Sequence, residues 1–144
     1  MTINTNNVVD FQSASHATGK GPLVVMLTSG PEDGGKRATL AYCAACTAVG
    51  MDTETRIFLV GDGAHWGYEG HEKNYHMKGF PPLGELIEMY RELGGKTYIC
   101  STCDQVCRIP GEEEYSDRVL RPDVLPSGLA TILPEISCGS SVTF

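Results

Sequence analysis

The sequence predicts an α/β fold, a three-layer α/β/α sandwich built on a mostly parallel five-stranded sheet in a single domain. Short apolar runs, typical of strands buried on both faces, alternate along the chain with longer segments of helical spacing. Turns rich in Gly and Pro separate the two kinds of segment. Because strands alternate with helices, we expect a parallel sheet that is covered by helices on both faces.

Composition and charge narrow the class of protein. The 144 residues are sufficient for one domain with one core. The formal net charge of −7 argues against nucleic acid binding, which requires clustered Lys and Arg. No apolar run approaches the ~20 residues of a membrane span, and residues 1–20 lack the apolar core of a signal peptide. We expect a cytoplasmic protein with a flexible polar tail over residues 1–20 and one domain over residues 21–144.

The first half of the domain predicts two buried strands joined by a helix. Leu23–Leu27 and Arg56–Val60 are short, mostly apolar runs, and each is followed by a Gly-containing turn. Between them, residues 33–49 carry alanines that allow close packing on a sheet, which predicts a helix with Gly50 as its C-cap. The turn before this helix resembles a phosphate-binding loop, but Arg37 replaces the Ser or Thr that the motif requires. Its acidic residues instead favour a polar turn at a helix N-terminus.

The second half of the domain continues the alternation. Residues 64–82 form a long connection, which is unusual in a small domain and often functional. The amphipathic spacing of residues 82–93 predicts a helix, and residues 96–100 form a strand after Gly94-Gly95. The remaining predicted elements are short: a helix over residues 102–108, an edge strand near Val124-Leu125, a helix over residues 127–135 and a strand over residues 141–144.

The six cysteines are the most informative residues, because in a reducing compartment they favour catalysis, metal binding or burial over disulfides. Cys100 is predicted at the carboxyl end of a strand, the edge at which ligands bind in open α/β sheets. Amide donors and the positive end of the next helix are expected to favour its thiolate. Cys103 and Cys107 lie four residues apart on one face of that helix. Cys100, Cys103 and Cys107 are therefore the predicted catalytic residues.

Cys43 and Cys46 allow two interpretations. They lie at i and i+3 of the alanine-rich helix, where free cysteine packs as a small apolar residue. Together with Cys100 and Cys103 they could instead form a metal-binding or redox-sensing module, because paired C-x-x-C motifs are typical of such sites. Apart from this alternative, no metal site and no cofactor are predicted.

The long connection carries His65, His71 and His76. Loop histidines are most often surface residues, and that interpretation is favoured here. The alternative is that the loop covers the Cys100 edge of the sheet and that His65 or His71 helps to ionise the thiol.

Several short motifs occur in order along the chain, and the most telling is a cysteine, Cys100, just after a Gly-Lys strand. The motifs are Ser29–Asp33, Phe58–Gly63, Pro82–Leu86, Gly95–Cys103, Gly128–Thr131 and Val142–Phe144. Together they resemble the DsrE/DsrF-like sulfur-relay family, and the resemblance covers residues 22–144.

The resemblance implies a compact α/β/α domain that assembles as a trimer or hexamer and carries sulfur on Cys100 as a persulfide or thiosulfonate. Cys103 falls where relatives carry Ser or Cys, whereas Cys107 and Cys138 match no family motif. The chemistry agrees, because a sulfur carrier needs a thiolate that attacks a sulfane sulfur and releases it again. Cys103 or Cys107 could release that sulfur by forming a disulfide. The acidic surface suits a thiol partner with a basic face, such as a small sulfur-carrier protein, and we expect sulfurtransferase-like activity.

Overall fold

The computed structural model describes residues 21–106 and 118–144. Five strands of this part of the chain form one sheet. All four strand pairs are parallel, and the strand order is β4-β3-β2-β1-β5. The strands are β1 (Leu23–Leu27), β2 (Thr55–Leu59), β3 (Lys96–Cys100), β4 (Val124–Ser127) and β5 (Ser140–Thr143). The predicted five-stranded parallel sheet is confirmed, and β4 is the short edge strand expected near Val124.

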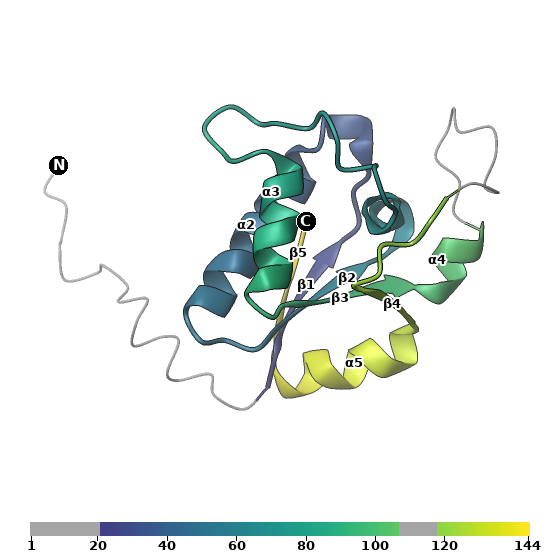
Figure 1. Cartoon of the computed structure of the whole chain (residues 1–144). Coiled ribbons are helices and arrows are strands. Elements are labelled where there is room, and N and C mark those ends of the chain that lie inside the picture. The colour runs from purple at the N-terminus through teal and green to yellow at the C-terminus, as the bar shows by residue number, and fades with distance from the viewer. Residues whose placement is uncertain (1–20, 107–117) are drawn as a thin grey trace, which may run out of the picture.

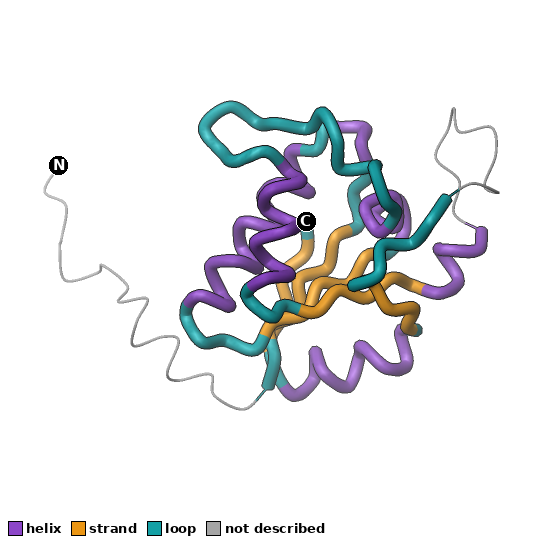
Figure 2. Tube along the Cα trace, viewed as in Figure 1, coloured by secondary structure: helices purple, strands orange, loops and turns teal. Residues whose placement is uncertain are grey.

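Helices cover both faces of the sheet (Figure 1). The helices α2 (Lys36–Gly50) and α3 (Leu83–Glu92) pack against each other on one face, whereas α5 (Leu129–Cys138) covers the other. The short α4 (Ser101–Val106) follows β3 directly at the carboxyl edge of the sheet. Figure 2 shows the strands as a layer between the two sets of helices, which confirms the three-layer sandwich.

The sheet divides the core into two unequal clusters, because consecutive residues of a strand point to opposite faces. Val25, Ile57 and Ile99 belong to the larger cluster, which the sheet forms with α2, α3 and the buried Trp66. The smaller cluster lies between the sheet and α5, and its buried members among the described residues are Val24, Phe58, Cys100 and Ile132. Cys100 therefore belongs to the thinly covered side of the molecule.

Helix boundaries differ from the predicted ones where the backbone turns sharply. Asp33 ends a short 3₁₀ helix, η2 (Pro31–Asp33), and α2 begins only at Lys36. Gly34 and Gly35 lie between them with φ of 75° and 78°, a left-handed conformation that glycine adopts readily and that interrupts the helix. At the other end of the chain, α5 runs past Pro134 to Cys138 instead of ending near residue 135.

The predicted long connection is partly helical. Its first part belongs to the 3₁₀ helix η3 (Gly61–Gly67), which lies directly on the carboxyl end of β1. A Cβ atom on Gly63 would stand 1.8 Å from the carbonyl oxygen of Leu27, so only glycine permits this close approach. The segment therefore covers the edge of the sheet where Cys100 lies, as the second interpretation of the loop expected.

Two parts of the prediction fall outside the described residues: the polar tail over residues 1–20, and Cys107 with Arg108 after α4. None of the described helices combines the length and the apolar character needed to cross a bilayer.

Candidate functional site

Cys100 is the last residue of β3, at the predicted strand end. Its side chain points toward α5, where it packs with Val24, Phe58 and Ile132. Only 7% of its surface is exposed. The predicted position is confirmed, but the thiol is shielded by apolar groups.

Cys103 lies in α4, one turn after Cys100, and is partly exposed. Its sulfur accepts a hydrogen bond from the backbone N–H of Gly61, with an N···S distance of 3.2 Å. Gly61 begins η3 with φ of 60°, which few residues other than glycine adopt. The turn after β2 thus places a backbone donor against the second thiol of the C-x-x-C motif.

Cys103 packs against the apolar cluster that contains Cys100, so the two side chains are neighbours. Burial raises the pKa of the Cys100 thiol, and this effect outweighs the backbone N–H groups of Cys103 and Thr102, which act in the opposite direction. The Cys103 side chain adds to the increase, because a second sulfur so close disfavours another negative charge. The expectation that the helix end makes Cys100 a ready thiolate is therefore wrong: desolvation dominates.

A hydrogen bond between Tyr68 and Asp104 connects α4 to the segment after η3. The Tyr68 hydroxyl donates a hydrogen bond to the Asp104 carboxylate, and Arg118 stacks over the Tyr68 ring with its Cζ atom 4.4 Å from the ring centroid. Burial and the Asp104 carboxylate both raise the pKa of Tyr68, so the phenol stays protonated and keeps donating. Because Asp104 adjoins Cys103, this contact fixes the orientation of the helix that carries the second thiol.

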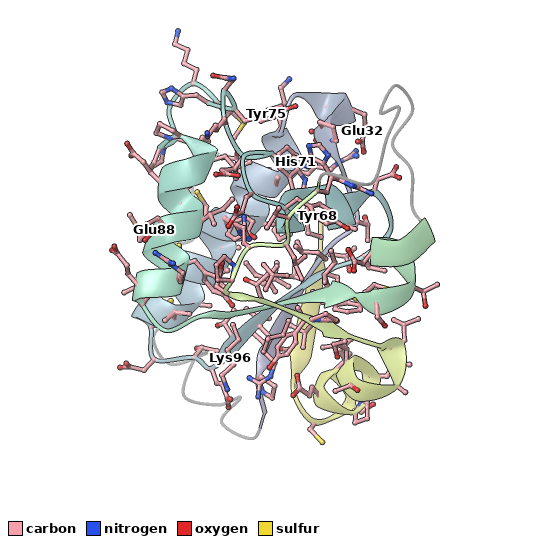
Figure 3. All side chains as sticks on the ribbon, turned by 45° about the vertical axis from the view of Figure 1, so that its right-hand side comes forward. Glu32, Tyr68, His71, Tyr75, Glu88 and Lys96 are labelled. Carbon is pink, nitrogen blue, oxygen red and sulfur yellow. The ribbon has the colours of Figure 1, made fainter. Side chains whose placement is uncertain are left out.

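His65 and His71 lie beside this contact, whereas His76 is exposed, as the surface interpretation expected. His65 packs edge-on against Trp66, and its ring centroid is 4.2 Å from that of His71. Figure 3 shows Tyr68 and His71 together at the end of the sheet opposite Lys96, the first residue of β3. His65 is buried, so its assignment as a surface residue is wrong. Burial lowers its pKa to about 4, which leaves a neutral ring that offers no positive charge to ionise a thiol.

Cys43 and Cys46 belong to the core cluster on the other face of the sheet from Cys100. Both belong to the larger core cluster, between the sheet and the helices α2 and α3. The Cys46 thiol donates a hydrogen bond to the carbonyl oxygen of Leu86 on α3, at an S···O distance of 3.5 Å. Cys100 lies on the opposite face of the sheet. The four-cysteine module is therefore wrong in its geometry, and the interpretation of Cys43 and Cys46 as packing residues fits the structure. Within residues 21–106 and 118–144, no three His, Cys, Asp or Glu side chains form a group that could hold a metal ion.

The phosphate-loop resemblance is likewise accounted for by local structure. The Asp33 carboxylate accepts hydrogen bonds from the backbone N–H groups of Gly35, Lys36 and Arg37 at 3.0–3.1 Å. A carboxylate of the chain itself thus occupies the donors that a phosphate would need.

Sequence reasoning did not identify Gly61, Tyr68 or Asp104 as parts of the site. One signal was present: Gly61-Asp62-Gly63 directly follows a strand, so it must lie at the same edge of a parallel sheet as Cys100. Tyr68 and Asp104 carried no such signal, because their contact joins segments 36 residues apart.

Comparison with known proteins agrees with the fold. The model of the DsrE/DsrF-like family matches residues 22–142. Among solved structures, the crystal structure of the YchN protein from E. coli is similar, with a TM-score of 0.64 and 16% sequence identity, covering 86% of this chain and 99% of that one. At this identity the likeness shows a shared fold. No curated protein sequence matches the chain significantly.

Proposed function

The chain belongs to the DsrE/DsrF-like family, and on that premise we propose that it is a sulfur carrier which holds sulfane sulfur on Cys100 and passes it to a partner thiol. The sulfur is held as a persulfide or a thiosulfonate. The observation that carries the proposal is the pair of neighbouring cysteines, Cys100 and Cys103, at the carboxyl edge of the parallel sheet. Ligands bind at this edge in open α/β folds.

Loading of a persulfide is a thiol exchange that needs no external oxidant. A thiolate of the chain attacks the outer sulfur of a donor persulfide, R–S–SH, so that a new S–S bond forms and the donor S–S bond breaks. The electron pair of the broken bond leaves with R–S⁻, which takes up a proton. The chain is left with one additional sulfur atom in the oxidation state that it had in the donor.

Release can follow two routes. A partner thiolate that attacks the outer sulfur takes it over as R′–S–SH and restores the thiolate of Cys100. Alternatively, the Cys103 thiolate attacks the inner sulfur, which forms a Cys100–Cys103 disulfide and expels HS⁻. A dithiol reductant must then reopen that disulfide before the next cycle.

Partner and assembly follow the same proposal. The net charge of −7 favours a partner with a basic docking face, such as a small sulfur-carrier protein. Assembly as a homotrimer or homohexamer is supported by exposed apolar side chains on β4 and α5, because exposed apolar patches mark interaction surfaces. These side chains are Leu125, Leu129 and Leu133, which are 55%, 48% and 53% exposed. We place the protein in the cytoplasm, where the thiols stay reduced.

The test is incubation of the full chain with glutathione persulfide, removal of the donor, and mass spectrometry of the intact protein and of its fragments. We expect a mass gain of one sulfur atom that fragment spectra assign to Cys100 when loading is complete. A protein that gains no sulfur, or that holds it on a residue other than Cys100, contradicts the proposal. The matched control is Cys138→Ser, which removes an exposed thiol at the end of α5 and is expected to load like the wild type.

A further inference from the structure

The two thiols of the site differ in their access to solvent. Cys100 is buried among Val24, Phe58 and Ile132, with 7% of its surface exposed. Cys103 is partly exposed and packs at the margin of both core clusters. Because Cys103 is the more exposed residue of the two, we expect a donor molecule to reach it more readily than Cys100, which requires local opening.

The surroundings of the two thiols also favour Cys103 as the more reactive one. The Gly61 N–H donates to the sulfur of Cys103 at 3.2 Å, and a backbone donor of this kind stabilises a thiolate or a developing negative charge on that sulfur. The left-handed conformation of Gly61 positions the N–H donor, and the Tyr68–Asp104 hydrogen bond positions the helix that carries Cys103. Desolvation favours the protonated form of Cys100 over its thiolate.

We propose that the site is a two-thiol relay, in which Cys103 takes the sulfur from the donor and Cys100 stores it. The inference rests on the proposed function and assigns a separate task to each thiol of that site. It is carried by the packing of the partly exposed Cys103 beside the buried Cys100, and by the Gly61 N–H that donates to the sulfur of Cys103.

Both steps of the relay balance without an oxidant. First, the Cys103 thiolate attacks the outer sulfur of R–S–SH and forms Cys103–S–SH, while R–S⁻ leaves with the electron pair of the broken bond. Second, the sulfur of Cys100 attacks the outer sulfur of Cys103–S–SH and forms Cys100–S–SH. The Cys103 thiolate leaves and takes up the proton that Cys100 gives up. The stored persulfide then lies in the apolar cluster under α5, where bulk thiols have little access.

The relay is tested by the rate of loading with glutathione persulfide in two single variants. Cys103→Ser is expected to load Cys100 at least about tenfold more slowly than the wild type, because the donor must wait for local opening. Cys100→Ser is expected to load Cys103 at the wild-type rate, but to lose that sulfur to added dithiothreitol faster than the wild type loses its own. Cys138→Ser serves as the control with unchanged kinetics, and fluorescence of the buried Trp66, the one tryptophan in the chain, verifies that each variant is folded.

The outcomes separate the relay from the function on which it rests. Loading of Cys100 in Cys103→Ser at the wild-type rate overturns the relay and leaves the sulfur-carrier function intact. Failure of Cys103 to load in Cys100→Ser also overturns it. A wild-type protein that takes up no sulfur removes both proposals together.

A measurement without any substitution gives an independent check. In the unloaded wild type, iodoacetamide is expected to modify Cys103 at least about tenfold faster than Cys100, since alkylation requires an accessible thiolate. Equal rates, or a faster reaction at Cys100, contradict the division of tasks.

Discussion

Ile132→Ala tests the packing that shields Cys100. Ile132 is the buried residue of α5, with 1% of its surface exposed, and it packs against Val24, Phe58 and Cys100. The substitution removes three methyl or methylene groups, each worth about 0.8 kcal/mol of transfer free energy. The cavity left in this small cluster adds to the loss, so we expect the free energy of unfolding to fall by about 2–4 kcal/mol.

The assay is urea unfolding followed by the fluorescence of Trp66, which is fully buried on the other face of the sheet and so reports global unfolding. With a slope of about 2 kcal/mol/M, the midpoint should fall by about 1–2 M urea. Ile132→Val, which removes one methylene, is expected to lose about 0.5–1.5 kcal/mol. Thr131→Ala, at an exposed neighbouring position, should change stability by less than about 0.5 kcal/mol.

The same variant should expose the storage thiol. Because Ile132 packs with the buried Cys100, its truncation is expected to increase the rate of Cys100 alkylation by iodoacetamide more than that of Cys103, which is already partly exposed. If Ile132→Ala unfolds at the same urea concentration as Thr131→Ala and does not change Cys100 alkylation, α5 does not shield Cys100 and the reasoning about the two thiols fails.

Three further predictions concern groups elsewhere in the fold. Burial and the neighbouring Cys43 raise the pKa of Cys46 from 9.0 to about 11. The free energy of unfolding of the wild type should therefore fall as the pH rises from 9 to 11, and that of Cys46→Ala should fall less steeply over the same range. Burial lowers the pKa of His65 from 6.5 to about 4, so stability present above pH 6.5 should be lost as the pH falls toward 4; an imidazole that titrates normally in an NMR titration contradicts this. Asp33→Ala removes the acceptor for three backbone N–H groups at the start of α2 and should destabilise the protein by about 1–2 kcal/mol in urea unfolding, whereas a neutral effect would show that the cap does not form.

The elements of the fold were predictable because each one has a strong local pattern. The run Leu23–Leu27 has one interpretation in a small α/β domain, and α3 follows its amphipathic spacing, with Leu83, Leu86, Ile87 and Tyr90 all buried. Helix ends were less predictable, since they depend on single backbone angles. The left-handed Gly34 and Gly35 delay the start of α2, and the periodicity of side chains does not report such a break.

The site was predictable in its position and less so in its chemistry. Cys100 at the end of β3 follows from the alternation of strands and helices. The burial of Cys100 under Ile132 and the contact from Gly61 to Cys103 depend on how distant segments pack, which no local pattern encodes. The expectation that Cys100 is a ready thiolate was wrong for the same reason. The backbone N–H groups of the turn after β3 favour the thiolate of Cys100, but packing under α5 removes the water that would stabilise its negative charge.

The central claim, that this chain holds sulfane sulfur on Cys100, is tested most directly by locating the sulfur atom in the loaded wild-type protein. After complete reaction with glutathione persulfide and removal of the donor, we expect one additional sulfur atom per chain, assigned by fragment mass spectra to Cys100. Sulfur found instead on any other cysteine, Cys103 included, or no gain in mass at all, would contradict the account.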